Sequence, residues 1–281
     1  MYLSAPTVRR AAASSSALVR QPMTDEQLIK VAPSIFANEA HDSRSERYTY
    51  IPTIDILRKL RGEGYLPFAA TQTRTRDADK REHTKHMIRL RKLDSFNLQR
   101  GEEVNEIVMV NSHDGSSAYQ LMPGVFRVVC SNGLVSGKHM GEIRVPHKGN
   151  VVDDVIEGVF RVVEDFELID SQKDAMKGLQ LDPTERLAFA RSALQLKYDT
   201  EAAAAPIHER QLLDVRRSAD NGGDLWTTFN VVQENMIKGG VRARTASNRR
   251  TTTRAVQGID QSIKLNRALW TLAEEMRKLK G

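Results

Sequence analysis

The sequence predicts an α+β fold: a small antiparallel sheet of about four strands, backed by helices and followed by a helical C-terminal region. Two changes in hydrophobic period support this fold class. Apolar residues recur every three to four positions before residue 64, every second position between 65 and 132, and every three to four positions again after 151. The chain of 281 residues, 40% of them hydrophobic, is long enough to bury a substantial core.

Two short helices are predicted before the sheet. Thr24 precedes the first, and Gln27 stands three residues later, at the second position of a capping box. Thr53 is the predicted cap of the second, an amphipathic stripe that ends near Gly62 and Gly64. Residues 1–23 contain no acid and no clear apolar stripe, so we expect a disordered tail there.

The predicted strands cover residues 65–76, 84–92, 105–112 and 124–132. Alternation of apolar and polar residues is clear in the first two. The charged connection at 76–83 separates these two strands and predicts a β-hairpin. The third strand is apolar on both faces and is therefore expected at the centre of the sheet.

Helical patterns dominate from residue 151 onwards. A long apolar stripe covers 151–169, and a second helical pattern follows Pro183. The alanine-rich segment "DTEAAAAP" near residue 200 precedes two more helices, around 225–236 and 265–279, whose apolar seams could pair. The predicted domains are therefore an α+β core over 24–199 and a helical region over 206–281.

The connection between the last two helices, "KGGVRARTASNRRTTTRAV" at 238–256, is strongly basic and contains no acidic residue. The whole chain has 42 lysines and arginines against 36 acids, so this one segment accounts for the entire net charge of +6. Hydroxyl side chains stand among the cations, and both groups bond phosphate oxygens. The segment therefore predicts a polyanion partner, and the alternative is a solvated loop. Its cations are Lys238, Arg242, Arg244, Arg249, Arg250 and Arg254.

A second informative segment is "NSHDGSSAYQL" at 111–121, whose possible site residues are Asn111, His113, Asp114 and Ser116. A Ser/His/Asp triad is disfavoured, because neighbours on one turn cannot normally form its hydrogen-bonded chain. A metal site would need more ligands, and His83 and His86 point to opposite faces of a predicted strand. The other candidate ligands are His139 and His147. The simplest interpretation is a turn at Asp114–Gly115 that leads into a capped short helix at 116–122.

Recognised cofactor motifs are absent. The sequence has no phosphate loop, no dinucleotide-binding glycine motif and no zinc motif of the HExxH or CxxC kind, so we expect no cofactor, no metal and no standard nucleotide or zinc enzyme. The single Cys130 excludes an intrachain disulfide framework. No apolar run is long enough for a membrane span, so we expect a soluble protein.

Several long runs of the sequence resemble one bacterial family. They are "PSIFANEAHDSRSERYTYIPT", "TKHMIRLRK", "NEIVMVNSHDGSSAYQLMPGVFRVVCSNGLVSG", "VPHKGNVVDDVIEG", "DLWTTFNVVQENMIKGG" and "TRAVQGIDQSIKLNRALW". Over roughly residues 24–276, the chain is similar to the plasmid- and prophage-borne family of YubP, YfjQ and YafZ. The resemblance implies a bacterial cytoplasmic protein of a mobile genetic element. It supplies no established activity and no established catalytic residue.

The leading functional hypothesis is a DNA-binding protein of a mobile genetic element that binds and anneals single strands without ATP. Lys85, Arg89 and Arg91 share one face of a predicted strand and would give the sheet a basic outer face beside the arginine segment. This arrangement looks similar to the β-β-β-α core of phage-type strand-annealing proteins. Presenting a DNA strand at length requires several subunits, so we expect a homo-oligomeric ring or filament.

Two alternatives remain open. One is an interaction protein of the mobile element that acts against a host defence or regulates a host factor through the helical C-terminal half. The other is a metal-dependent nuclease that uses Asp114, Glu106 and nearby histidines around a divalent ion. Salt-dependent DNA binding would distinguish the leading hypothesis from the first alternative, and metal-dependent turnover would distinguish it from the second.

Overall fold

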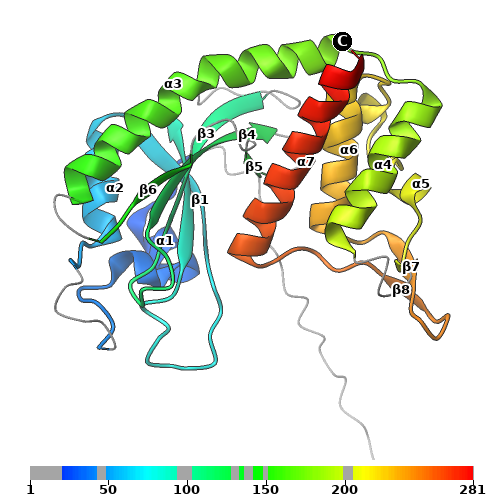
Figure 1. Ribbon diagram of the computed structural model, residues 1–281. Helices are drawn as coiled ribbons and strands as arrows, with labels where there is room; N and C mark the ends of the chain where they lie inside the picture. Colours follow the sequence, from blue (N-terminus) through cyan, green and yellow to red (C-terminus); the bar gives the residue numbers. More distant parts are fainter. Residues whose placement is uncertain are drawn as a thin grey trace, which may run out of the picture.

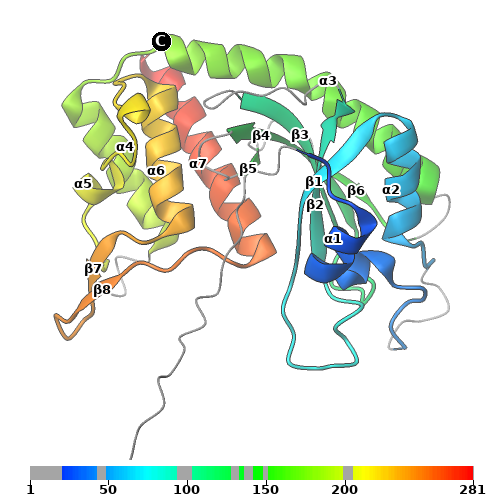
Figure 2. The same cartoon turned by 180° about the vertical axis from the view of Figure 1, so that it is seen from behind.

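The computed structural model confirms the predicted α+β fold, with an antiparallel sheet, helices packed on it and a helical C-terminal region (Figure 1). The sheet and the helical region lie side by side, and the long helix α3 (Val151–Gly178) runs along both (Figures 1 and 2). The structure describes residues 21–42, 49–93, 103–127, 133–135, 142–147, 151–198 and 205–280. Most of the predicted disordered tail over 1–23 therefore lies outside the described residues.

The N-terminal helices begin at or beside their predicted caps. The Thr24 hydroxyl accepts a hydrogen bond from the Gln27 backbone nitrogen at 3.4 Å, and the Gln27 side chain accepts one from the Thr24 nitrogen at 3.0 Å. These two bonds complete the capping box of α1 (Asp25–Val31), which a 3₁₀ turn, η1 (Pro33–Phe36), follows. Thr53 is not the cap of α2 (Thr53–Gly62) but its first residue, and its side chain is used elsewhere.

The sheet is antiparallel with the strand order β1-β2-β3-β4, so the third predicted strand lies in its interior as expected. β1 and β2 form the predicted hairpin. The short helix predicted at 116–122 is wrong, because β4 already begins at Tyr119 and pairs with β3 from Gln120 onwards. The short strands β5 and β6 both pair with β4. The strands are Tyr65–Gln72 (β1), His86–Lys92 (β2), Glu103–Asn111 (β3), Tyr119–Arg127 (β4), Gly133–Val135 (β5) and Ile143–Val145 (β6).

Helix α3 belongs to two hydrophobic cores. It is 28 residues long, which corresponds to roughly 42 Å at 1.5 Å per residue. Val155 and Val159, in its first half, pack in the core that α2 and the sheet share. Ile169 and Met176, in its second half, pack in the core of the helical region. The helix therefore holds the sheet and the helical region together along one side of the molecule (Figure 1).

The helical region is organised around aromatic side chains. Trp226 stacks on Phe229 with ring centroids 5.4 Å apart, and Trp270 packs edge-on against both. The apolar seams of α6 and α7 pair as predicted, and α4 packs on both helices. The elements are α4 (Pro183–Lys197), α5 (Glu209–Leu212), η3 (Ser218–Asp220), α6 (Leu225–Lys238) and α7 (Ile259–Lys280). Helix α4 precedes the predicted domain boundary near residue 200 but packs in the layer that follows it, so that boundary stays a prediction. Residues 199–204 of the alanine-rich segment lie outside the described ranges.

Helix α7 also joins the helical region to the sheet. Ile259 and Ile263, near its start, pack on a face of the sheet formed by Val108, Val110 and Met122. An ion pair of 2.8 Å between the Lys85 ammonium and the Asp260 carboxylate lies beside this contact. In the part of the chain that the structure describes, no helix combines the length and the apolar character that a membrane span requires.

Candidate nucleic-acid interface

The basic segment 238–256 forms a short two-stranded ribbon between α6 and α7 (Figure 1). Its strands are β7 (Arg242–Arg244) and β8 (Arg250–Thr252), which pair antiparallel. Arg242 lies opposite Thr252, Ala243 opposite Thr251, and Arg244 opposite Arg250. The segment is therefore the predicted connection between two helices, and part of it has regular structure that the sequence did not predict.

The base of the ribbon is fixed by two glycines with positive φ. Gly239 has a φ of 65° and Gly240 a φ of 76°, a region that residues with a Cβ rarely adopt. The Gly240 nitrogen donates to the Thr253 carbonyl at 2.8 Å, and the Thr253 nitrogen donates to the Val241 carbonyl at 2.9 Å. Arg216 also donates a hydrogen bond of 2.5 Å to the Gly239 carbonyl. The ribbon consequently leaves α6 in a defined direction.

One face of the ribbon is buried and the other is basic. Val241 and Ala243 pack into the core of the helical region. Side chains alternate between the faces of a strand, and directly opposed residues share a face. Arg242, Arg244 and Arg250 therefore lie on the outer face, where all three are exposed. This arrangement holds three guanidinium groups together on a surface that the core fixes from behind.

The turn of the ribbon is closed by hydroxyl and amide side chains. The Thr245 hydroxyl accepts a hydrogen bond from the Arg249 nitrogen at 3.1 Å and lies 3.0 Å from the Ser247 hydroxyl. Asn248 adopts a φ of 61°, which asparagine tolerates better than most residues. The Arg244 guanidinium donates to the Asn248 side-chain oxygen at 3.0 Å. These bonds order the turn without neutralising any of its charges.

Five of the six cations in the segment have no carboxylate partner within the ranges that the structure describes. Lys238 differs from the others, because its ammonium lies 2.7 Å from Glu234, which Arg217 also contacts. Among the described residues, no ion pair involves any of the remaining five, and all five are exposed: Arg242, Arg244, Arg249, Arg250 and Arg254. Uncompensated cations on an ordered surface attract anionic partners.

A hollow of about 960 Å³ lies between the ribbon and residues 205–211. The Arg244 nitrogen donates to the Pro206 carbonyl at 3.0 Å, and Gln211 donates to the Arg242 carbonyl at 2.7 Å, so these bonds fix the two walls relative to each other. Among the described residues, the lining includes cationic and neutral polar side chains and no acid: His208, Gln211, Arg242, Arg244, Thr245, Arg250 and Thr251. The basic surface is therefore concave as well as ordered.

The predicted basic outer face of the sheet is wrong. Arg89 and Arg91 do share a face, but only 7% and 6% of their surfaces are exposed. Each donates a hydrogen bond of 2.6 Å to the carboxylate of Glu106, which is 1% exposed, and Arg91 also lies over the Phe68 ring at 4.5 Å. Lys85 is paired with Asp260. A buried charge without a partner would cost several kcal/mol. Because Glu106 is that partner, Arg89 and Arg91 belong to the packing of the sheet and not to its exposed surface.

The segment 111–117 forms the predicted turn but not the predicted helix. The Asp114 carboxylate accepts a hydrogen bond from the Ser116 nitrogen at 2.9 Å, and Gly115 has a φ of 75°. Asn111 and His113 are fully buried, whereas Ser116 is exposed. The four residues therefore divide between a surface turn and the interior and do not face one common pocket.

A buried polar cluster contains Asn111 and His113 together with residues that sequence analysis did not connect. The Thr53 hydroxyl is its centre: it accepts from the Asn111 amide at 3.0 Å and lies 3.0 Å from Nε2 of His86 and 3.2 Å from Nε2 of His113. His147 Nε2 lies 3.0 Å from the Asn111 side-chain oxygen. The cluster ties the start of α2 to β2, to the end of β3 and to His147, the second residue after β6. Sequence analysis names the histidines as candidate metal ligands, Asn111 as a possible site residue and Thr53 as a helix cap, but no local pattern joins them.

The three histidines of this cluster are held in the neutral form. Burial lowers the pKa of His86 to about 4 and that of His113 to about 3, and it also lowers the pKa of His147. Nδ1 of His113 is buried and has no hydrogen-bond partner in the described part of the chain. A neutral, enclosed network of this kind orders the end of the sheet and offers no exposed group for catalysis.

The structure does not assemble the proposed nuclease site. Glu106, in the middle of β3, lies five positions before Asn111 at its end, or roughly 16 Å away, and Asp114 lies further along the chain. Glu106 is moreover occupied by Arg89 and Arg91. Within the described ranges, no three His, Cys, Asp or Glu side chains are placed to hold a metal ion, and His139 lies outside those ranges.

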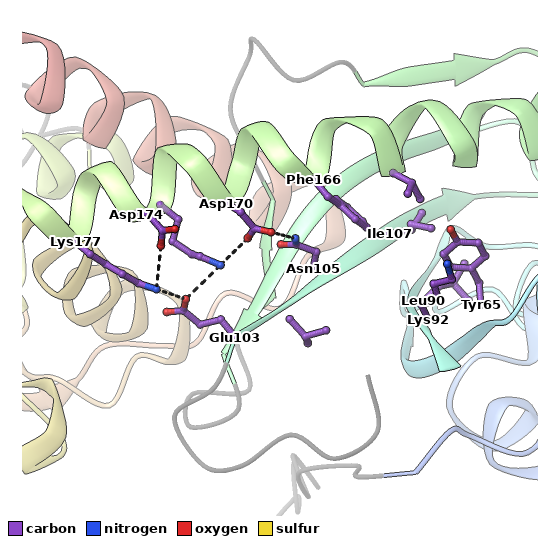
Figure 3. A pocket seen from close by; sticks show the side chains of 13 residues that line it. Tyr65, Leu90, Lys92, Glu103, Asn105, Ile107, Phe166, Asp170, Asp174 and Lys177 are labelled. Carbon is purple, nitrogen blue, oxygen red and sulfur yellow. Dashed lines mark hydrogen bonds and ion pairs between the residues drawn. The ribbon is translucent and has the colours of Figure 1, made fainter. Parts of the chain in front are cut away.

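A second pocket, of about 600 Å³, lies between α3 and strands β2 and β3 (Figure 3). Most of its charged groups pair with one another: Glu103 contacts Lys177 at 3.0 Å and Lys173 at 3.5 Å, and Asp170 accepts from Asn105 at 2.9 Å and pairs with Lys173 at 2.7 Å. The remaining lining is largely apolar, with Tyr65, Leu90, Val104, Ile107, Val163 and Phe166. Paired charges of this kind distinguish the pocket from the uncompensated arginines of the ribbon.

The fold and the ribbon together define an α+β protein with an ordered, exposed arginine surface. The chain belongs to the family described as Domain of unknown function (DUF932), whose model matches residues 40–270. It is similar to UPF0380 protein YfjQ and UPF0380 protein YafZ of Escherichia coli (strain K12), at 52% and 51% identity over 256 residues. Each alignment covers 91% of this chain and 92% of the relative. No solved structure matches the chain. The family resemblance indicated by the sequence motifs is thereby confirmed, and the relatives' names state no activity.

Proposed function

We propose that this protein binds DNA through the β7–β8 ribbon, by contacts to the phosphate backbone that do not depend on base sequence. The observation that carries the proposal is the set of five exposed arginines in segment 238–256, none of which has a carboxylate partner among the described residues. Arginine forks match phosphate oxygens, and phosphate contacts supply most of sequence-independent affinity. The hydroxyls of Thr245, Thr251 and Thr252 add further phosphate donors beside them.

In this proposal the same surface holds a single strand by its backbone alone. Segment 238–256 contains no aromatic residue, so it offers no platform on which bases can stack. A strand bound there through phosphates keeps its bases free to pair, which strand annealing requires. The sequence contains no phosphate loop, so annealing would proceed without ATP. In this proposal the protein serves the DNA of a mobile element, and several subunits act together as a ring or filament on one strand.

Fluorescence anisotropy with a labelled oligonucleotide of mixed sequence, repeated at several salt concentrations, tests the proposal. Five arginine–phosphate contacts predict that log K falls against log salt with a slope of about −4. Replacing Arg242, Arg244, Arg249 and Arg250 with glutamine should reduce the magnitude of that slope by about 3. The melting temperature should change little, because exposed charges contribute less than about 1 kcal/mol each to folding.

A charge-matched variant provides the control. It replaces four exposed or half-buried cations that each pair with a carboxylate elsewhere on the surface: Arg161, Arg191, Lys278 and Lys280. This variant loses the same formal charge and should keep its DNA affinity. Absence of binding at low salt, or an equal loss in both variants, would overturn the proposal. A duplex of the same sequence is measured in parallel, because a two-stranded ribbon can also enter a major groove.

A further inference from the structure

The loop between β1 and β2, residues 73–85, forms a second arm on the same side of the molecule as the ribbon. Both hairpins extend toward the lower edge of Figure 1, one from the sheet and one from the helical region, and the opposite view in Figure 2 shows the same relationship. The base of the loop is closed by a hydrogen bond of 2.8 Å from the Thr73 nitrogen to the Lys85 carbonyl. The loop therefore leaves the sheet in a defined direction.

The two arms are connected through the start of α7. Lys85, at the base of the loop, pairs with Asp260 at 2.8 Å, and β8 ends at Thr252. The eight residues from Thr252 to Asp260 can span at most roughly 29 Å. Arg254 lies exposed on this connection. The bases of the two arms are consequently close enough for one extended ligand to reach both.

The loop carries its own uncompensated cations. Arg74, Arg76 and Arg81 are exposed, and within the described residues none of them forms an ion pair, whereas Lys80 lies 3.7 Å from Asp77. The threonines of "TRTR" at 73–76 alternate with arginines, so hydroxyl and guanidinium donors stand side by side as they do in the ribbon. The loop also contains Asp77, Asp79 and Glu82, which oppose an anionic ligand.

We propose that the β1–β2 loop is a second phosphate-binding arm, which contacts the same DNA strand as the ribbon through Arg74, Arg76 and Arg81. This inference rests on the proposed DNA binding and adds the path of the strand: from the ribbon, past Arg254, to the loop. A span of at most roughly 29 Å corresponds to no more than about nine nucleotides at 3.4 Å each, the rise of one strand in a duplex. Shorter strands reach one arm, and longer strands reach both.

The test measures how affinity depends on strand length. Single strands from about 5 to about 30 nucleotides are titrated against the unaltered protein and against the full-length variant with Arg74, Arg76 and Arg81 changed to glutamine. For the long strands the salt slope should lose about 2 in magnitude and affinity should fall at least about tenfold. For the shortest strands, which the ribbon alone can hold, both quantities should stay unchanged. Arg161→Gln, Lys278→Gln and Lys280→Gln together give a variant of equal charge, on α3 and at the C-terminal end of α7, far from both hairpins (Figure 1).

A second variant of the loop tests the sign of the effect. Changing Asp77 and Asp79 to asparagine and Glu82 to glutamine should raise affinity for long strands only. Equal effects at every length, or no effect of either loop variant, would overturn the second arm while the ribbon variant still reports on the proposed function. If the unaltered protein binds no strand of any length, both the proposed function and this inference are wrong.

Discussion

Arg244 and Arg250 lie directly opposite each other across the β7–β8 ribbon, on its exposed face. Like charges in this position destabilise a pair of strands by roughly 0.2–1 kcal/mol. The cost is tolerated because Val241 and Ala243 anchor the ribbon in the core of the helical region. A phosphate between the two guanidinium groups would convert the repulsion into two charge-assisted hydrogen bonds. The pair is therefore arranged for an anionic ligand at a small cost in stability.

Arg250→Thr should make the free protein slightly more stable and the complex weaker. The free energy of unfolding should rise by up to about 0.5 kcal/mol, because the repulsion with Arg244 is removed. The salt slope of DNA binding should lose about 1 in magnitude. Arg242→Thr is the matched control: it should weaken binding equally without stabilising the fold, since Arg242 lies opposite Thr252. Urea denaturation and anisotropy titration measure the two quantities, and a gain in stability for both variants would contradict the argument.

The base of the ribbon offers a second matched pair. A Cβ on Gly239 would lie 2.6 Å from the Arg254 carbonyl carbon and 2.6 Å from the Thr253 oxygen, whereas a Cβ on Gly240 would meet nothing within 4 Å. Both residues have positive φ, which costs a residue with a Cβ roughly 1–2 kcal/mol. Gly239 also has a ψ of −150°, in a region that is essentially confined to glycine. Gly239→Ala should cost at least about 1 kcal/mol more, because the backbone of residues 253–255 must shift. Equal denaturation midpoints for the two variants would show that the backbone of residues 253–255 moves aside at no cost.

Local patterns predict the elements well because each depends on neighbouring residues. The alternation in β2 correctly separates Ile88 and Leu90 from Arg89 and Arg91. The same alternation cannot show that Glu106 lies beside both arginines, because that contact depends on the register between β2 and β3. For this reason the sequence predicts a basic surface where the structure has two buried arginines that share one glutamate.

The candidate site, like the sheet, is predictable from the sequence only where it depends on neighbouring residues. Charge density in segment 238–256 is a local property, so the sequence correctly predicts a concentration of exposed cations there. The strands β7 and β8 are three residues each, too short for periodicity to indicate them. The polar cluster brings Thr53, His86 and His147 together from distant parts of the chain. That cluster exists only in the tertiary fold. The local sequence around His113 therefore indicates a turn and nothing of the cluster.

The buried histidines predict that stability falls between about pH 7 and about pH 5. His86 and His113 stay neutral in the folded protein at these pH values, since their pKa values are lowered to about 4 and about 3. In the unfolded chain they take up protons below about pH 6.5. The unfolded state then binds more protons, so the free energy of unfolding decreases as pH falls, by about 2 kcal/mol per histidine at pH 5.

Urea denaturation at several pH values measures this loss. Carboxylates whose pKa values are lowered in the fold, such as Glu234 and Glu142, act only below about pH 4.5, so they do not obscure the histidine window. His147 adds to the loss in the same direction. A free energy of unfolding that stays constant from about pH 7 to about pH 5 would show that the cluster accepts protons without opening.

The last prediction separates annealing from passive coating of DNA. Two complementary, dye-labelled single strands are mixed with and without the protein, in the absence of any nucleotide, and the rate of pairing is followed by energy transfer. Faster pairing is expected, because the ribbon holds phosphates and leaves bases free, and because bound cations reduce the repulsion between two strands. The variant with Arg242, Arg244, Arg249 and Arg250 changed to glutamine should lose this acceleration, while the charge-matched variant at Arg161, Arg191, Lys278 and Lys280 should keep it. Unchanged pairing by a protein that binds single strands well would contradict annealing and leave a protective coat as the function of the same arginine surface.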